Sequence, residues 1–292
     1  MEKDLEFWLS FHSIPGFKST DFSLIKSKFD SIEKAWKASE ADLAKVGISK
    51  SVVNHIISQR SHQDPLEQLE KLDRYGVKAI TSDNHFFQNN LQRLSSISPI
   101  IYYKGDITLL EGKSISLIGN FETTDYSREV ARNIIKDLVA HGYAFVGGFA
   151  KGMDSLCHNT TLLYKGKTIG VLSSGIDIIY PSQNLDLSRE ITDLGLLITD
   201  KSMGSRPSKN SYLSSKQLVT TISAASIFIE GKEDGIELSI ISNAIKQKKP
   251  IFAIPGNIFS YTSRGPNLLI TQGNAQPIVH FSEVIDYIEK SR

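Results

Sequence analysis

The chain has 292 residues, which is long enough for two folded domains, and its 40% hydrophobic and 22% charged residues are typical of a globular protein. Its net charge of +1 excludes a global field that attracts nucleic acid or an anionic membrane, so any anion must bind at a local patch. The single cysteine, Cys157, excludes an intrachain disulfide framework and fits a reducing compartment. The polar N-terminus is unlike a secretory signal, and no apolar run approaches the roughly 18 residues of a membrane span. We therefore expect a cytoplasmic protein that does not enter a membrane.

The first part of the chain, from about residue 4 to residue 75, carries helical periodicity and no convincing strand. Ser39 predicts the start of one helix and Gly47 predicts its end. We expect a small all-helical domain over residues 1–75. Apolar residues recur there at spacings of three and four: Ile32, Ala35, Trp36, Leu43, Val46 and Ile48.

From Gly76 onward, β-rich runs alternate with helical stretches, and this order predicts a doubly wound, mostly parallel α/β sheet over residues 76–292. Ligands of such sheets bind beyond the carboxyl ends of the strands, so the turns after the strands are the places to search. The Ser- and Lys-rich segment 201–216 is expected to form a long surface loop. The expected strands are Lys78–Thr81, Ile100–Lys104, Ser114–Ile118, Ala144–Gly147, Thr168–Leu172, Leu196–Thr199, Ser226–Glu230 and Pro250–Ile254.

The turn GGFAKGMDSLCH, residues 147–158, follows one of these strands. Gly147 and Gly148 allow a ligand to approach the backbone, and Lys151 adds a positive charge beside a helix start that favours anions. Asp154 stands where a carboxylate caps a helix. The turn is therefore either a phosphate-binding site or a strand–helix connection whose glycines serve packing. His158 and Asp154 share a helix face, but no Ser or Cys nucleophile is matched to them, so we expect no catalytic residues, metal or cofactor.

Two further turns carry the same kind of signal. Ser173, Ser174 and Gly175 leave backbone N–H groups free at a strand end, and Asn184 is expected to cap the next helix. Pro255-Gly256 ends a later strand, and Arg264 and Asn267 follow at a helix start. Arg264 is either a phosphate contact or a solvated surface residue.

Three long segments resemble successive signatures of one family: GGFAKGMDSLCH, GVLSSGIDIIYPSQN and FAIPGNIFSYTSRGPNLLITQG. The N-terminal segments SIPGF, FDSIEKAW and ADLAKVGIS resemble the helical domain of the same family. Three long motifs in the right order are far more specific than a single glycine motif. The chain is therefore similar to the DNA-processing protein A (DprA/Smf) family over nearly its whole length.

The resemblance implies an extended Rossmann-like fold, preceded by a helical domain like a SAM or helix-hairpin-helix module. It also implies a non-enzymatic homodimer that binds single-stranded DNA in a basic pocket, protects incoming DNA and loads the recombinase RecA during natural transformation. Together with the turns above, it places the DNA-binding residues at Gly119, Asn120, Gly147, Gly148, Phe149, Lys151, Gly152, Ser173, Ser174, Gly175, Lys216, Arg264 and Asn267.

The chain departs from the family pattern where the family carries cations. Phe121 replaces an arginine of the family's first signature, which removes a bidentate phosphate donor. An arginine-rich signature has become SYLSSKQ, in which Lys216 is the only cation, and a Ser-Gly-Ser/Thr signature has become EDGIELS. Stacking of bases on Phe121, Phe149 or Tyr212 would compensate, although Phe149 also fits the apolar core. No segment matches the C-terminal winged-helix domain of many members, and we expect a divergent member without it.

Two other functions stay open on the sequence. One is a nucleotide-binding or phosphoribohydrolase-like protein, because Glu237 keeps a glutamate of those enzymes, although their glycine–threonine loop is missing. The other is a dimeric scaffold that has lost DNA binding. In the helical domain, IPGF and KVGIS resemble the hairpins of tandem helix-hairpin-helix modules, but the first lacks a second glycine. That domain therefore either contacts DNA or has a structural or partner-docking role.

Overall fold

The computed structural model describes residues 3–94 and 97–290, which divide into two compact units. The smaller unit contains Met1–Tyr103, Gly175–Ile178 and Asp200–Ser205. The larger unit contains Lys104–Ser174, Ile179–Thr199 and Arg206–Arg292. The expected domain boundary at residues 75/76 falls directly after the last N-terminal helix, and as a boundary between independent domains it remains a proposal.

The smaller unit begins with the expected run of helices: α1 (Leu5–His12), α2 (Ser19–Lys28), α3 (Ile32–Lys37), α4 (Glu40–Lys45), α5 (Lys50–Arg60) and α6 (Leu66–Arg74). As predicted, the side chain of Ser39 caps α4, and Gly47, with a φ of +95°, follows its end. The helices pack around buried aromatic rings, including the stacked pair Trp8 and Phe22, so the apolar periodicity has produced a core. Strands β1 (Lys78–Thr81) and β2 (Ile100–Gly105) pair antiparallel, with Lys78 opposite Tyr103, and α7 (His85–Asn90) lies between them in the sequence.

The larger unit contains seven parallel strands in the spatial order β6-β5-β4-β3-β7-β8-β9. The chain starts in the middle at β3 and winds first to one side and then to the other, which confirms the predicted doubly wound, Rossmann-like sheet. The eight predicted strands of the chain are all present within one or two residues of their expected bounds. The strands here are β3 (Ser114–Ile118), β4 (Ala144–Gly148), β5 (Thr168–Val171), β6 (Leu196–Thr199), β7 (Ala225–Phe228), β8 (Ile251–Ala253) and β9 (Gln276–Pro277).

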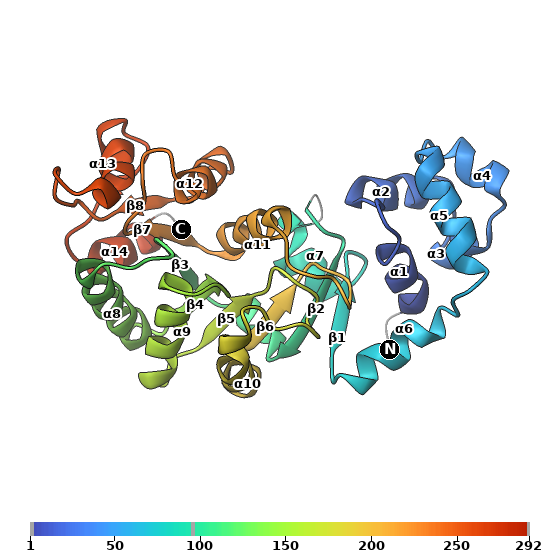
Figure 1. The fold of residues 1–292 in the computed structure, drawn as a ribbon, viewed down its shortest axis with the longest axis horizontal. Coiled ribbons are helices and arrows are strands. Elements are labelled where there is room, and N and C mark those ends of the chain that lie inside the picture. The colour runs from blue at the N-terminus through green and yellow to red at the C-terminus, as the bar shows by residue number, and fades with distance from the viewer. Residues whose placement is uncertain (1–2, 95–96, 291–292) are drawn as a thin grey trace. The chain divides into compact units, whose positions relative to one another are not determined.

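Helices cover both faces of this sheet (Figure 1). On one face, α8 (Asp125–Ala140), α9 (Met153–Leu163) and α14 (Ser282–Lys290) enclose a core that includes Ile135, Phe145 and Val284. On the other face, α12 (Ile236–Lys246) and α13 (Arg264–Thr271) pack over Phe228. Two further helices, α10 (Leu185–Leu194) and α11 (Lys209–Ile222), complete the unit.

The structure differs from the sequence-based expectation for one loop and adds one strand. The segment 201–216 is not a loop throughout, because α11 begins at Lys209 inside it. The side chains of Ser208 and Ser211 bond reciprocally to each other's backbone N–H groups, and this cap starts the helix despite a serine-rich sequence of modest helix propensity. Strand β9 was not expected, because two residues carry no periodicity and only the neighbouring strand β8 defines it.

A buried histidine links helix α9 to the neighbouring strands β4 and β5. His158 on α9 has no exposed surface, and its Nε2 lies 2.9 Å from the carbonyl oxygen of Gly148 on β4. Its Nδ1 lies 2.6 Å from the hydroxyl of Thr168 on β5. The carbonyl can only accept, so Nε2 carries the proton and Nδ1 accepts from the hydroxyl. Burial lowers the pKa of His158 to about 4, so the ring stays neutral in the native state.

We expect this histidine to destabilise the protein in acid. The pKa of His158 is about 4 in the folded protein and near the ordinary 6.5 in the unfolded chain. The contribution of His158 to the free energy of unfolding is therefore complete above pH 6.5 and is lost as the pH falls toward 4. In His158→Asn, the free energy of unfolding should fall less steeply between pH 6.5 and pH 4, as measured by urea unfolding at several pH values. His62→Asn, at an exposed position, is the control and should match the wild type. Parallel pH profiles for wild type and His158→Asn would contradict this expectation.

Candidate functional site

The sheet of the larger unit reverses its winding direction between β3 and β7, and the turns after β3, β4 and β5 surround a pocket of about 800 Å³. This is the side of an open α/β sheet where ligands bind. Every lining residue belongs to the larger unit. They are Phe121, Phe149, Ala150, Lys151, Ser173, Ile179, Tyr180, Pro181, Ser182, Gln183, Pro207, Ser208, Lys209, Tyr212 and Ser215.

A buried ion pair lies between the turn after β4 and helix α11. The ammonium of Lys216 lies 2.5 and 2.6 Å from the two carboxylate oxygens of Asp154, and both side chains are buried. Burial alone would lower the pKa of Lys216, but the Asp154 carboxylate outweighs it, and the pKa is raised. Asp154 also accepts a hydrogen bond from the backbone N–H of Ala150 at 3.1 Å and does not cap α9 with its side chain, so the expected cap was wrong. The ammonium of Lys216 is therefore bonded to the Asp154 carboxylate of the protein itself.

The space beside the glycines of this turn is occupied by other atoms of the protein. A Cβ added at Gly148 would lie 2.6 Å from the Asp154 carboxylate and 2.8 Å from the Lys216 ammonium, so the ion pair needs this glycine. Gly152 has a φ of +79°, and a Cβ there would overlap the carbonyl oxygen of Phe121. Packing therefore accounts for these glycines, and their contact with DNA stays a prediction.

The loop after β3 lies against the same turn. The backbone N–H of Met153 points to the carbonyl of Asn120 at 3.4 Å, and the side chain of Met153 fills the space over Gly119. Phe121, next in the chain, reaches the pocket with its ring exposed. This turn-to-loop contact fixes the backbone from which Phe121 projects.

The loop after β5 supplies the next part of the lining. Ser173 lines the pocket, whereas Ser174 is buried and its carbonyl accepts a hydrogen bond from Thr199 at 2.9 Å. Asn184 occupies the N-cap position of α10, as expected, but its side chain makes no capping hydrogen bond; its amide instead donates to the carbonyl of Phe149 at 3.0 Å. The loop is thereby bonded to the end of β4.

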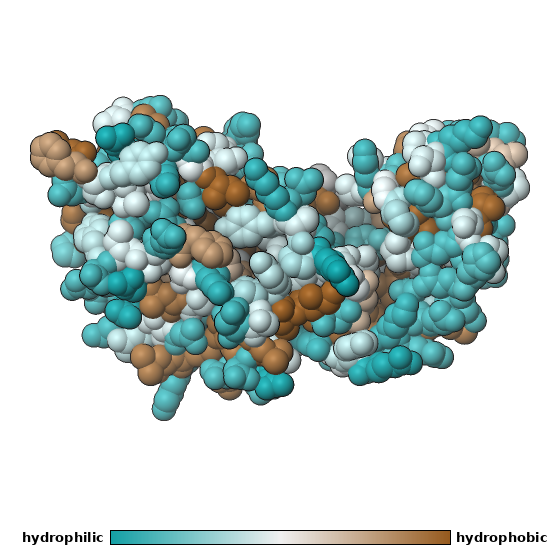
Figure 2. All heavy atoms as spheres, viewed as in Figure 1, coloured by the Kyte–Doolittle hydropathy of each residue, from teal (hydrophilic) through white to brown (hydrophobic). Residues whose placement is uncertain are grey.

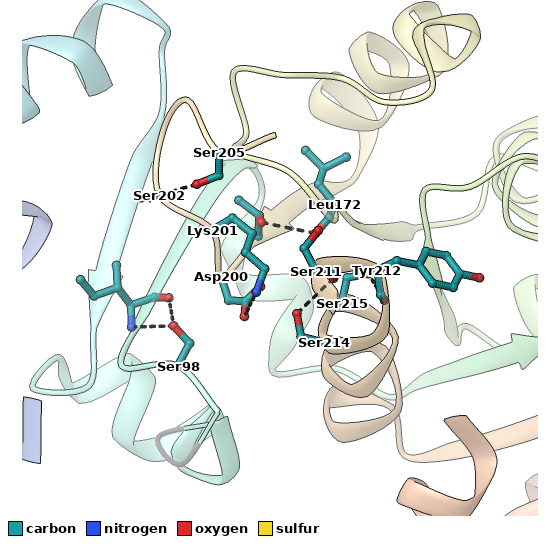
Figure 3. Close-up of polar contacts among 12 residues, drawn as sticks. Ser98, Leu172, Asp200, Lys201, Ser202, Ser205, Ser211, Tyr212, Ser214 and Ser215 are labelled. Atoms are coloured by element: carbon teal, nitrogen blue, oxygen red, sulfur yellow. Dashed lines mark hydrogen bonds and ion pairs between the residues drawn. The ribbon is translucent and has the colours of Figure 1, made fainter. Parts of the chain in front are cut away.

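The first turns of α11 complete the pocket. Lys209, Tyr212 and Ser215 line it, and Figure 3 shows the serine hydroxyls of this helix bonded back to its own backbone, as Ser215 is to the carbonyl of Tyr212. Lys209 and Tyr180 were missed from the sequence. The spacing of Ser208 and Ser211 was the available signal for the helix start that carries Lys209.

Several other predicted site residues lie outside the pocket lining. Arg264 pairs with Glu233 at 3.4 Å and lies over the ring of Tyr261. Asn267 exchanges two hydrogen bonds with the backbone of Gly256. Gly175 belongs to the smaller unit, where its N–H donates to Ser205. Of the predicted residues, Phe149, Lys151 and Ser173 line the pocket directly.

The candidate reactive side chains beside the pocket, Cys157, Asp154 and His158, are all buried. Cys157 is fully buried and burial raises the pKa of its thiol, which removes the reactive thiolate. Asp154 and His158 each have separate partners, so they do not form a catalytic pair. No group of three or more His, Cys, Asp or Glu side chains could hold a metal within residues 3–94 and 97–290. Over the same residues, no helix is long and apolar enough to cross a membrane.

The family model for DNA recombination-mediator protein A matches residues 78–289, and the chain belongs to this family. The prediction from the three signatures is confirmed. Protein Smf of Synechocystis is 27% identical over 256 residues, which are 86% of this chain and 64% of that protein. DNA processing protein DprA of Bacillus subtilis is 28% identical over 249 residues, 82% of this chain and 84% of that protein. This chain thus spans less than two thirds of the Synechocystis relative.

Solved structures agree with the fold. DNA processing protein A of Streptococcus pneumoniae superposes with a TM-score of 0.84 at 20% identity, covering 96% of this chain and 97% of the other. The Helicobacter pylori protein, whose structure is described for its single-stranded DNA binding mode, has a TM-score of 0.60 at 28% identity, covering 66% and 87%. The fold of this chain is therefore that of the solved DNA processing protein A structures.

We expect the Lys216–Asp154 pair to act as a unit. Lys216→Met leaves a buried carboxylate without its counter-ion and should lower the free energy of unfolding by about 3–5 kcal/mol. Asp154→Leu should cost a similar amount, whereas the double variant should be more stable than either single variant, because no buried charge remains. Denaturant unfolding of the four proteins measures this cycle. Lys34→Met, in an exposed ion pair, should change little. Additive destabilisation in the double variant would show that the two residues are not coupled.

Proposed function

We propose that this protein binds single-stranded DNA in the pocket beyond β3, β4 and β5, protects incoming DNA and loads the recombinase RecA onto it during natural transformation. The observation that carries the proposal is the pocket itself, where exposed Lys151 and Lys209 lie among aromatic side chains. The description of the Helicobacter pylori relative by its single-stranded DNA binding mode supports single-stranded DNA as the ligand. In this proposal the protein works in the cytoplasm as a homodimer and is not an enzyme.

The arrangement suits a single strand better than a duplex. Two cations on different elements can contact phosphates, and aromatic faces are available to bases that only a single strand exposes. Lys151 is held in place by the turn, because Asp154 bonds to the N–H of its neighbour Ala150 and to Lys216. In the proposal, Lys216 and the glycines of the turn shape the site, while Lys151 and Lys209 meet the phosphates.

The first test of this proposal is a salt-dependent titration with single-stranded and double-stranded oligonucleotides. Lys151→Glu and Lys209→Glu should each weaken binding to the single strand, and Lys151→Glu more than Lys151→Ala, because the new charge repels phosphate. Removing one lysine–phosphate interaction should lower the magnitude of the log–log salt slope by roughly 0.7. Lys290→Glu, an exposed cation on α14, is the control. Superimposable curves for all variants, with folding intact, would overturn the proposed site.

The homodimer is proposed from an apolar groove elsewhere on the larger unit. Residues of α8 and the segment 278–281 line a groove of about 400 Å³. Val279 in its lining is 78% exposed, and Ile258 before α13 is 74% exposed. Figure 2 shows apolar surface on the viewed face of this unit beside α13. Interfaces of homodimers are more apolar than the remaining surface, so this region suits a second copy.

If two chains associate at this groove, the molecular mass in solution should depend on Val279. Light scattering at tens of micromolar, where complexes of micromolar affinity are populated, should give twice the mass of one chain. Val279→Asp should shift the protein toward the monomer, because it buries a charge at the interface. Leu163→Asp, at an equally exposed apolar residue on α9, should leave the mass unchanged. A monomeric wild type at these concentrations would exclude the dimer.

A further inference from the structure

The pocket has few cations to offer to phosphate. Of its lining residues, all of which the structure describes, Lys151 and Lys209 are the cations. Lys216 lies next to the lining, but its ammonium is buried against Asp154. Breaking that pair would leave a buried charge, so Lys216 is not available to a phosphate. Two phosphate contacts alone give weak binding, because the electrostatic contribution to affinity grows with the number of phosphates that are neutralised.

Two large aromatic side chains on the pocket are exposed to an extent that core packing does not explain. Phe121 is 57% exposed and Tyr180 is 58% exposed, and both line the pocket. The other two aromatic residues are less exposed, because Phe149 is buried against His158 and Tyr212 is half-buried. Exposed aromatic faces in a concave surface mark a binding surface, since solvation of the ring is unfavourable until a partner covers it.

The backbones that carry the two exposed rings are both fixed. Phe121 follows Asn120, and its carbonyl lies against Gly152 of the β4–α9 turn. Tyr180 lies in the loop that Asn184 bonds to the carbonyl of Phe149. The rings therefore project into one pocket from two anchored loops, which reduces the conformational entropy cost of binding a ligand.

We propose that Phe121 and Tyr180 stack on the bases of single-stranded DNA, so that this pocket holds bases as well as phosphates. The inference rests on the proposed function, that this pocket binds single-stranded DNA. Every base has a flat π face, so the contact is tolerant of sequence. Duplex DNA cannot make this contact, because its bases are already stacked on one another. Phe121 thus supplies a base contact at the position where the family resemblance leads one to expect a phosphate-binding arginine.

The experiment compares a labelled 20-nucleotide oligothymidine with a backbone of the same length built from abasic residues. Wild-type protein should bind the oligothymidine more tightly. Phe121→Ala and Tyr180→Ala should each weaken that binding by about 5-fold to 150-fold, the range measured for stacking on one base. Neither variant should change the binding of the abasic backbone or the salt slope. Phe121→Trp and Tyr180→Phe should keep the affinity.

Controls separate this inference from the proposed function. Lys151→Glu should weaken the binding of both oligonucleotides, whereas Tyr164→Ala, an exposed aromatic residue on the larger unit outside the pocket lining, should affect neither. Equal binding of oligothymidine and abasic backbone by the wild type would overturn the stacking while leaving the DNA site in place. This comparison does not depend on whether the variants fold. Absence of binding to both at low salt would overturn the proposed function itself.

Discussion

The candidate site depends on the ion pair between Lys216 and Asp154. Asp154 belongs to the first turn of α9 and Lys216 to the middle of α11, and neither charge would be stable in the interior without the other. The pair holds the turn that carries Lys151 against the helix that carries Lys209. It also requires a glycine at position 148, because any side chain there would displace the charged groups. The buried ion pair, the glycine at position 148 and the geometry of the pocket therefore depend on one another.

The loops beyond the strands are held by contacts to backbone carbonyl groups. Gly152 permits the carbonyl of Phe121 to pack on the β4–α9 turn, and Asn184 bonds to the carbonyl of Phe149. His158 bonds to the carbonyl of Gly148. Such contacts satisfy buried polar groups that would otherwise be costly, and they fix the loops without using the surface of the pocket. The exposed side chains remain free to meet a ligand.

The chain has the fold of its family, but the charged side chains near its pocket differ from those expected from the family signatures that it resembles. Phe121 stands in place of an arginine, and Lys216 is turned inward to a carboxylate. Beyond β7, Glu233 holds Arg264, so this cation is also engaged within the protein. An exposed pair of this kind is weak, and Arg264 can exchange Glu233 for a phosphate more readily than Lys216 can exchange Asp154. The pocket therefore has fewer unengaged cations than the signatures of the resemblance lead one to expect.

The sequence by itself determined the helical N-terminal region, the positions of the strands along the chain and the family, because periodicity, capping by Ser39 and three long signatures are all local in the chain. It also located the turn with Lys151, since a strand end followed by glycines is a local pattern. Tertiary structure alone decided that Lys216 meets Asp154, 62 positions away, instead of a ligand. It likewise decided that the side chain of Asn184 bonds to the carbonyl of Phe149 instead of to the N–H groups of its own helix, and that Lys209 and Tyr180 reach the same pocket. The reason is physical: partners of buried polar groups are chosen by distance in space, which one-dimensional spacing does not encode.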